Sequence, residues 1–183
     1  MAAVFVNGYG ATKDSRDRNY QAYLSAVRTF IWNKAGDGPH TLFLCGGHTN
    51  RDDLTEAETM RRWFEAHPLP RGVKVVLIDD TVDARNNICR MEKRLRPEQS
   101  VVIFCEYSRR RTMRFFAGRL FRHFEVRGIP FDQHSLRLEH RVMQALFHLP
   151  LEVLAWYVQP ADDVRNWLRA RHIRRARSVE RNV

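Results

Sequence analysis

The chain has 183 residues, 44% of them apolar, and a formal net charge of +10. This composition excludes disorder as the default state and is sufficient for the core of one domain with a small appendage. No stretch approaches ~20 uncharged apolar residues, and residues 1–10 lack the pattern of a secretory signal, so we expect neither a membrane span nor secretion. The three cysteines are odd in number, which favours reduced thiols and a cytoplasmic location.

The positive charge is concentrated in two segments. Residues 90–127 hold 11 Lys or Arg against 4 Asp or Glu, and residues 160–183 hold 7 against 3, whereas residues 1–89 hold 11 of each. Nearly all of the excess is arginine, which binds phosphate oxygens bidentately. Phosphorylated ligands and nucleic acid are therefore natural partners, and a solvated helix face with a basic tail is the plain alternative.

Strand-like and helix-like segments alternate along the chain. Apolar runs at 3–10, 41–47, 73–80 and 100–107 predict four buried strands, and a weaker fifth strand is expected within 124–136. Segments with a helical period predict helices at 14–34, 54–66, 81–95, 112–124, 139–157 and 161–177. Strands that are apolar throughout are typical of a parallel sheet with helices on both faces.

Local signals mark where some of these helices begin. Thr55, followed three residues later by Glu58, is a capping-box pattern, and Asp80 or Thr81 is a good N-cap for the helix at 81–95. Successive βα units predict a three-layer, Rossmann-like α/β domain over residues 1–136, with a mainly parallel sheet of about five strands. We expect residues 137–183 to form a helical extension that packs on this domain and carries a basic tail.

In such a sheet, ligands bind beyond the carboxyl ends of the strands, near the point where the strand order reverses. The candidates are therefore residues that follow the predicted strands or begin the next helices. The predicted ligand-binding residues are Asn7, Gly8, Gly46, Gly47, His48, Glu56, Asp79, Asp83, Asn87, Tyr107 and Arg111. The candidates for catalysis are Asp80 and Glu106.

Gly46 and Gly47 directly follow an apolar run, where their backbone N–H groups could face a phosphate or carboxylate. A tight turn is the plain alternative, because the segment is neither a GxGxxG motif nor a P-loop. Glu56 lies in the first turn of the next helix, where the helix dipole favours a carboxylate without any function. Its functional alternative is to bind a ribose or sugar hydroxyl.

Carboxylates gather after the third and fourth predicted strands. Asp79, Asp80 and Asp83 could hold Mg²⁺ or share a proton, but no second motif supplies further ligands, so no metal site is predicted. Glu106 could act as a general acid or base. Tyr107 could stack on a base or join the core. Cys45 fits a small buried residue better than a nucleophile.

Several arginines, at 109–111 and at Arg114, lie at the start of the fourth βα helix, where the helix dipole disfavours cations. A bound anion would offset this effect, which makes Arg111 the candidate phosphate contact. Residues 165–181 resemble a basic amphipathic helix. That helix could touch nucleic acid or an anionic membrane surface, or could simply be solvated.

The segments "CGGHTN", "LTEAETM", "DDTVDARNN" and "VVIFCEYSRRR" resemble, in order and spacing, the YdcF/SanA-like family, a bacterial domain of unknown function. The resemblance covers roughly residues 2–125, and Ser108 stands where that family usually has His. It implies a Rossmann-like domain with a polar pocket for an adenosyl-type ligand, S-adenosylmethionine or a nucleotide. The residues that fit the family pattern are Gly46, Gly47, Thr55, Glu56, Ala57, Met60, Thr81, Asn87, Tyr107 and Arg111.

Three classes of function follow from these patterns. The first is the binding of an adenosyl or nucleotide-like, phosphorylated small molecule at the carboxyl ends of the strands, with or without catalysis. The second is a hydrolase or transferase acting on a phosphorylated sugar, with Glu106 or the aspartates as acid and base. The third is nucleic-acid binding through the Arg-rich helix and the basic tail. The sequence leaves turnover and oligomeric state open.

Overall fold

A single parallel sheet organises the protein. The computed structural model describes residues 2–8, 17–37, 40–48, 54–81, 83–130, 142–159 and 162–168. The sheet has the order β3-β2-β1-β4-β5, and every neighbouring pair is parallel. The predicted Rossmann-like α/β class is confirmed, and so is the weaker fifth strand. The strands are β1 (Ala2–Asn7), β2 (Thr41–Cys45), β3 (Lys74–Ile78), β4 (Ser100–Glu106) and β5 (Phe124–Ile129).

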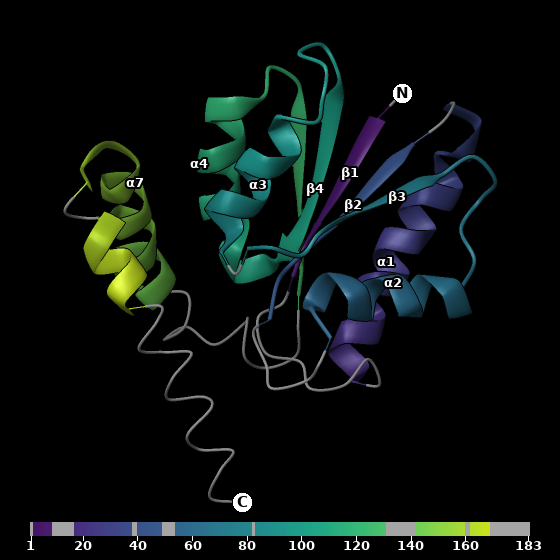
Figure 1. Ribbon diagram of the computed structural model, residues 1–183, viewed down its shortest axis with the longest axis horizontal. Helices are drawn as coiled ribbons and strands as arrows, with labels where there is room; N and C mark the ends of the chain where they lie inside the picture. The colour runs from purple at the N-terminus through teal and green to yellow at the C-terminus, as the bar shows by residue number, and fades with distance from the viewer. Residues whose placement is uncertain are drawn as a thin grey trace, which may run out of the picture.

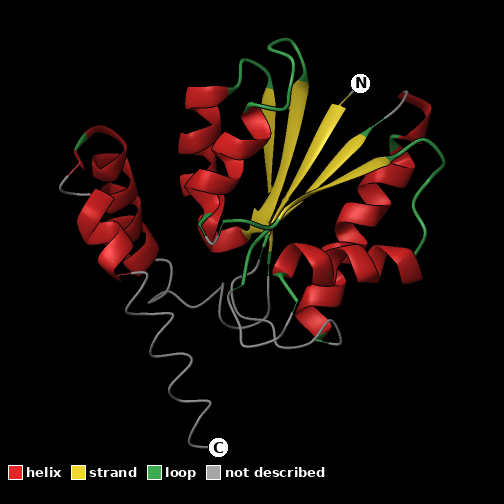
Figure 2. Ribbon diagram, viewed as in Figure 1, coloured by secondary structure: helices red, strands yellow, loops and turns green. Residues whose placement is uncertain are grey.

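Helices cover both faces of this sheet (Figures 1 and 2). α1 (Arg18–Asn33) and α2 (Glu56–Ala66) lie on one face, and α3 (Ala84–Glu92) and α4 (Arg110–Leu120) lie on the other. Each face has its own apolar core, and the two cores meet at the sheet. The uniformly apolar strands β1, β2 and β4 are buried on both sides, as expected for a three-layer arrangement.

Side chains cap the starts of three helices. The backbone N–H of Glu58 donates to Oγ1 of Thr55 at 3.1 Å, which confirms the predicted start of α2. Asp17 accepts from the N–H of Tyr20 in the same way. The predicted cap of α3 is wrong, because Asp83 rather than Asp80 or Thr81 accepts from the first turn, from the N–H of Asn86 at 2.8 Å.

The helix expected at 112–124 ends earlier than the apolar pattern predicts. The backbone of Phe121 is extended, and its N–H closes α4 by donating to the carbonyl of Ala117 at 2.8 Å. Phe124 was expected on the apolar face of that helix. It begins β5 instead, where it pairs with Val101 of β4. The helical period of the aromatic residues continued past the end of the helix, so the pattern alone placed the boundary too late.

Helical segments follow the sheet in the C-terminal part of the chain. A π-helical turn, η3 (Gln144–His148), leads into α7 (Leu149–Tyr157), and residues 162–168 are also helical. Trp156 of α7 stacks on Phe116 of α4 with ring centroids 5.5 Å apart, so α7 lies on the outer side of α4 (Figure 1). The remaining residues of the predicted helices at 139–157 and 161–177 lie outside the described residues. None of the described helices combines the length and apolarity needed to cross a bilayer.

Candidate ligand site at the carboxyl ends of the strands

The strand order reverses between β1 and β4. From β1 the chain runs outward through β2 to β3, and then returns to place β4 on the other side of β1. The carboxyl ends of all five strands point to the same edge of the sheet, away from the N-terminus in Figure 1. Ligands of doubly wound sheets bind at such a reversal. We call the residues around it the rim, namely Asn7, Gly8, Gly46, Gly47, Glu56, Glu106 and Ser108.

The two glycines after β2 form a turn whose donors are already used. The N–H of Gly46 donates to the carbonyl of Ile78 at 2.9 Å, and that of Gly47 donates to the carbonyl of Thr81 at 2.6 Å. Their own carbonyls accept from the first turn of α2, at 3.0 Å for Gly46 and 3.2 Å for Gly47. These bonds tie β2 to α2 and to the end of β3. They favour the tight-turn alternative for these N–H groups over contact with an anion.

Glycine is required here because other groups already occupy the space. A Cβ on Gly47 would lie 2.7 Å from the carbonyl oxygen of Thr81. Gly46 has φ of +150°, and a Cβ there would lie 2.5 Å from Oε2 of Glu56. The same carboxylate oxygen would also collide with a Cβ on Gly8. The structure therefore brings Gly8, Gly46 and Glu56 together, with the buried carboxylate packed directly against both glycines.

Two tyrosines of α1 close the rim on the α1 side. The hydroxyl of Tyr23 lies 3.0 Å from the carbonyl oxygen of Asn7 and 2.9 Å from that of Phe104, so it bridges β1 and β4 where the strand order reverses. Burial raises the pKa of Tyr23 well above its usual value. The pKa of Tyr20 is also raised, first by burial and then by the carboxylate of Glu56. Both phenols therefore stay neutral hydroxyls at physiological pH.

Asn7, the last residue of β1, carries an unusual polar atom. Its side chain is almost completely buried, and Nδ2 donates to the carbonyl of Gly8 at 3.1 Å. Its Oδ1, however, has no hydrogen-bond partner within the described part of the chain. A buried acceptor left without a donor costs about 1–3 kcal/mol, and native proteins keep few of them. Asn7 thus places an unused acceptor at the strand-order reversal.

The residues after β3 mostly serve the local structure. The hydroxyl of Thr81 donates to Oδ1 of Asn87, and both side chains are buried. Asp83 caps α3, and Asp80 forms an ion pair with Arg90 at 3.0 Å on the surface. Asp79 and His48 are exposed. The predicted aspartates therefore do not converge, and the described residues contain no group of three or more His, Cys, Asp or Glu that could hold a metal.

The end of β4 places a carboxylate beside a hydroxyl. Oγ of Ser108 donates to Oε2 of Glu106 at 2.8 Å, and Nε of Arg109 lies 4.0 Å from the same oxygen. Tyr107 is half-buried in the short η2 turn (Tyr107–Arg109), and Arg111 is exposed in the first turn of α4. Of the two residues proposed for catalysis, Glu106 lies at the reversal in strand order, whereas Asp80 lies beyond β3.

The thiols are held in their protonated form. Burial raises the pKa of Cys105 to about 12 and that of Cys45 well above its usual range. Cys89 is half-buried, and its pKa is also raised by burial. A thiolate nucleophile at Cys45 is therefore disfavoured, in agreement with its interpretation as a small buried residue.

No protein-family model matches the chain, and no curated protein sequence matches it. The resemblance to the YdcF/SanA-like family stays a prediction from the motifs.

The roles of Tyr20 and Tyr23 are not evident from the sequence. Both residues fit the apolar period of the helix at 14–34, so they predict only core packing. The hydroxyl groups of these two residues are the signal that could have distinguished them from ordinary core residues. Two hydroxyl-bearing aromatics occupy core positions on the first helix after β1, where Phe or Leu would fill the space equally well.

Proposed function

We propose that the protein binds a small molecule of adenosyl or nucleotide type at the rim, with Asn7 as the central contact. The observation that carries this proposal is the buried Oδ1 of Asn7 at the reversal in strand order, which accepts no hydrogen bond from any of the residues that the structure describes. An adenine amino group or a ribose hydroxyl supplies the donor that this oxygen lacks. Binding would then satisfy an acceptor that is left unsatisfied when the rim is empty.

The carboxylates of the rim suit the same chemistry. Glu56 is packed against Gly8 and Gly46, and Glu106 lies at the end of the neighbouring strand β4. Carboxylate oxygens bind hydroxyl and amino donors, or the cationic sulfonium of S-adenosylmethionine, in preference to a bare phosphate. The N–H groups of Gly46 and Gly47 are already bonded, so a phosphate of the ligand would need the arginines at the start of α4.

Turnover of the bound molecule, by a transferase or hydrolase reaction, is a proposal that rests on Glu106. This carboxylate already accepts a hydrogen bond from Ser108, and it lies beside the proposed binding position. A carboxylate in that place can take or give a proton. Asp80 is the weaker candidate, because it is engaged with Arg90 on the surface.

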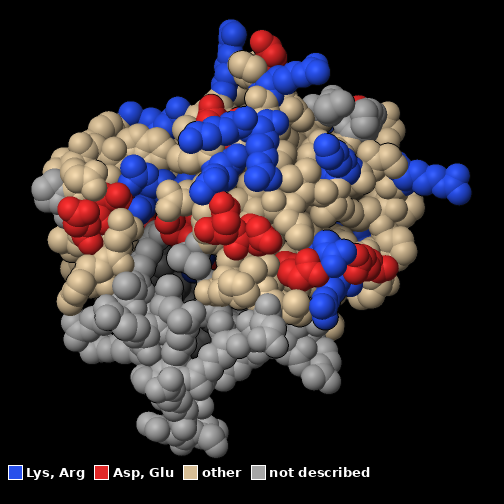
Figure 3. All heavy atoms as spheres, in the orientation of Figure 1, with Lys and Arg blue, Asp and Glu red and all other residues tan. Residues whose placement is uncertain are grey.

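Nucleic-acid binding is the second candidate, and exposed basic residues favour it. Figure 3 shows Lys and Arg gathered over the upper part of this face, on the side away from the carboxyl ends of the strands. Guanidinium groups on one surface can follow a phosphate backbone, and such binding weakens steeply with salt. It would not depend on Asn7. The exposed arginines on α3, α4 and their ends include Arg90, Arg94, Arg111, Arg114 and Arg122.

A thermal-shift panel separates these candidates. Its probes are S-adenosylmethionine, nucleotides, nucleotide sugars and short oligonucleotides, each tested on the wild type and on Asn7→Leu. A ligand at about 100 times its Kd stabilises a protein by about 2.7 kcal/mol, which raises Tm by a few degrees. We expect one adenosyl or nucleotide compound to raise Tm in the wild type but not in Asn7→Leu.

The matched control is Asn33→Leu, the same change at the exposed end of α1, which should keep the full shift. Asn7→Ser serves if Asn7→Leu does not fold. An equal shift in wild type and both Asn7 variants would contradict the proposal. A response to oligonucleotides alone would move the function to the arginines.

A further inference from the structure

The C-terminal helices expose an unusual amount of apolar surface. Leu146, Phe147, Leu154 and Trp167 are each between 53% and 63% exposed. Among the Asp, Glu, Lys and Arg residues of the described parts of 142–168, Asp163 is the exposed one. We call the exposed apolar side chains of the described residues within 142–168 the C-terminal apolar surface. In Figure 3 much of the flank over α7 is tan, and acidic atoms in red lie among the tan ones.

The exposed apolar side chains come from consecutive parts of the chain. Leu146 and Phe147 lie in the π-helical turn η3, Leu154 lies in α7, and Trp167 lies in the helical residues 162–168. Contiguous apolar surface of this kind marks an interaction site, because proteins that stay free in water rarely leave it uncovered.

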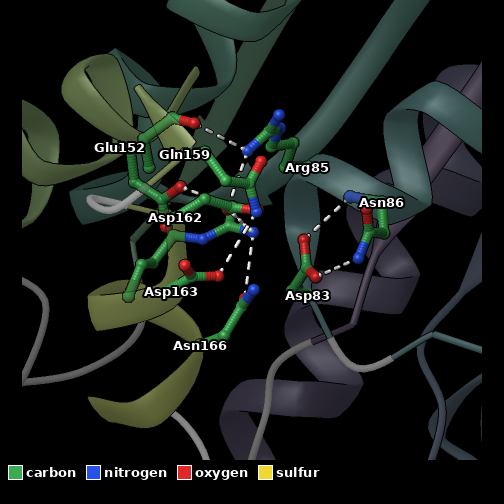
Figure 4. Close-up of polar contacts among 10 residues, drawn as sticks. Asp83, Arg85, Asn86, Glu152, Gln159, Asp162, Asp163 and Asn166 are labelled. Atoms are coloured by element: carbon green, nitrogen blue, oxygen red, sulfur yellow. Dashed lines mark hydrogen bonds and ion pairs between the residues drawn. The ribbon is translucent and has the colours of Figure 1, made fainter. Parts of the chain in front are cut away.

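Two charged side chains of the same helices, Glu152 and Arg165, are buried, and Asp162 is partly buried beside them. Nη1 of Arg165 donates to Glu152 at 3.1 Å, and its Nη2 lies 2.6 Å from Asp162. Arg85 of α3 reaches across to Asp162 at 2.9 Å and to the carbonyl of Ala155 at 3.1 Å (Figure 4). These bonds, with the stacking of Trp156 on Phe116, fix which side of the helices faces outward.

Positive charge borders the C-terminal apolar surface. The guanidinium of Arg119 on α4 lies 5.0 Å from the ring centroid of Tyr157, whose side chain is exposed. Directly after Leu168, residues 169–183 contain six Arg and one Glu. Exposed apolar side chains, Arg119 beside them and an arginine-rich sequence that follows directly in the chain are a combination that binds anionic lipid, because apolar burial and headgroup attraction add.

We propose that the C-terminal apolar surface docks on an anionic lipid surface. Charge argues against a second copy of the chain as the occupant, because a symmetric contact would bring Arg119 and the arginine-rich C-terminal sequences of both copies to the same interface. Aliphatic side chains argue against nucleic acid, whose phosphates and base edges offer no partner for Leu146 or Leu154. Tryptophan and tyrosine at the edge of the surface suit the interfacial region of a bilayer. The inference is independent of the ligand proposed for the rim.

Vesicle co-sedimentation of the full chain tests the proposal. The two probes are vesicles of pure phosphatidylcholine and vesicles that also contain phosphatidylglycerol. We expect binding to the anionic vesicles, much weaker binding to the neutral ones, and a loss of affinity as salt is raised. The fluorescence of Trp167 should shift to the blue on binding, because its ring leaves water.

Two matched substitutions sharpen this test. Trp167→Ser should weaken vesicle binding by about tenfold, and so should Phe147→Ser, because each removes a large apolar side chain from the contact. Trp32→Ser removes an equally exposed tryptophan from α1 and should leave binding unchanged. Trp167 and Phe147 are both exposed, so neither substitution should change Tm by much.

Three outcomes would overturn the proposal. One is the absence of vesicle binding, or equal binding to neutral and anionic vesicles. Another is a dimer in analytical ultracentrifugation that Trp167→Ser dissociates, which would assign the surface to a second copy. The third is oligonucleotide binding that Trp167→Ser abolishes while vesicle binding stays the same.

Discussion

α1 and the C-terminal helices differ in which side chains they expose. α1 buries Tyr20, Leu24 and Ile31 against the sheet. The described residues within 142–168 bury Glu152 and Arg165, together with Ala155, and expose Leu146 and Trp167. The contrast shows that an apolar side chain in a predicted helix does not by itself mark the face that meets the protein. The outer face of α1 suits contact with water, whereas the outer face of the C-terminal helices suits contact with an apolar partner.

The largest effect on stability is expected from substituting the buried Arg165 of the C-terminal helices. Arg165→Met removes the buried partner of Glu152 and one of the two arginines that pair with Asp162, and breaking such a buried pair costs about 3–5 kcal/mol. Amide hydrogen exchange of residues 149–157 should report it as easier opening of α7. The double variant Glu152→Leu/Arg165→Met should regain much of the loss, because an apolar replacement removes the unpaired charge as well.

Arg62→Met is the matched control, since Arg62 is exposed and its ion pair with Glu58 is 3.7 Å long. Surface pairs of this kind contribute about 0–1 kcal/mol, so this change should hardly be detected. An equally small effect of Arg165→Met would show that the buried ion pairs do not hold the C-terminal helices in place.

The glycine turn of the rim gives the next effect. Gly47→Ala forces a Cβ against the carbonyl oxygens of Thr81 and Asp79, both parts of the backbone, so we expect a loss of about 1–3 kcal/mol in urea unfolding. Gly36→Ala is the control, because no atom lies within 4 Å of the position its Cβ would take. Equal stability of the two variants would contradict the steric account of the turn.

A smaller effect is expected from pH. Burial raises the pKa of Glu152 above its usual value of 4.5, and hydrogen bonding to Arg165 opposes this only in part. The folded state therefore binds the proton more tightly than the unfolded state. Its contribution to stability is complete below pH 4.5 and is lost as pH rises through the raised pKa. Tm of Glu152→Gln should decline less over this range than Tm of the wild type, and parallel curves would contradict the assignment.

Thiol labelling of the cysteines in β2, α3 and β4 should show the smallest effect. Cys45 and Cys105 are buried with raised pKa values, so a disulfide reagent should label neither in the native protein. Cys89 is half-buried and should react, more slowly than a free thiol. Unfolding in urea should expose all three. Fast labelling of Cys45 in the native protein would contradict this account and make Cys45 a candidate nucleophile.

The fold could be predicted because its signals are local and repeated. Uniformly apolar strands, each followed by a helical period, are sufficient to infer a parallel sheet between two helix layers, and Thr55 marks the start of α2 correctly. The site was predicted less completely, because hydrogen bonding depends on tertiary neighbours. Nothing local indicates that the N–H of Gly47 meets the carbonyl of Thr81, or that Tyr23 bridges β1 and β4.

The start of α3 was predicted wrongly because three neighbouring residues are suited to the same capping role. Asp80, Thr81 and Asp83 are all acceptable N-caps, and the chain uses the third while Thr81 bonds to Asn87. The ion pair of Arg85 with Asp162 joins positions 77 residues apart, and that of Glu152 with Arg165 joins positions 13 residues apart, so no short-range pattern indicates these two pairs.

The most direct test of the account concerns Asn7 itself. In protein labelled with ¹⁵N only at asparagine, the side-chain NH₂ resonance of Asn7 is assigned by its absence in Asn7→Leu. The probe is S-adenosylmethionine, followed by the nucleotide that gives the largest thermal shift. We predict that the Asn7 resonance moves on titration while that of Asn33 stays in place. A stationary Asn7 resonance under a probe that raises Tm would contradict the assignment of the rim as the ligand site.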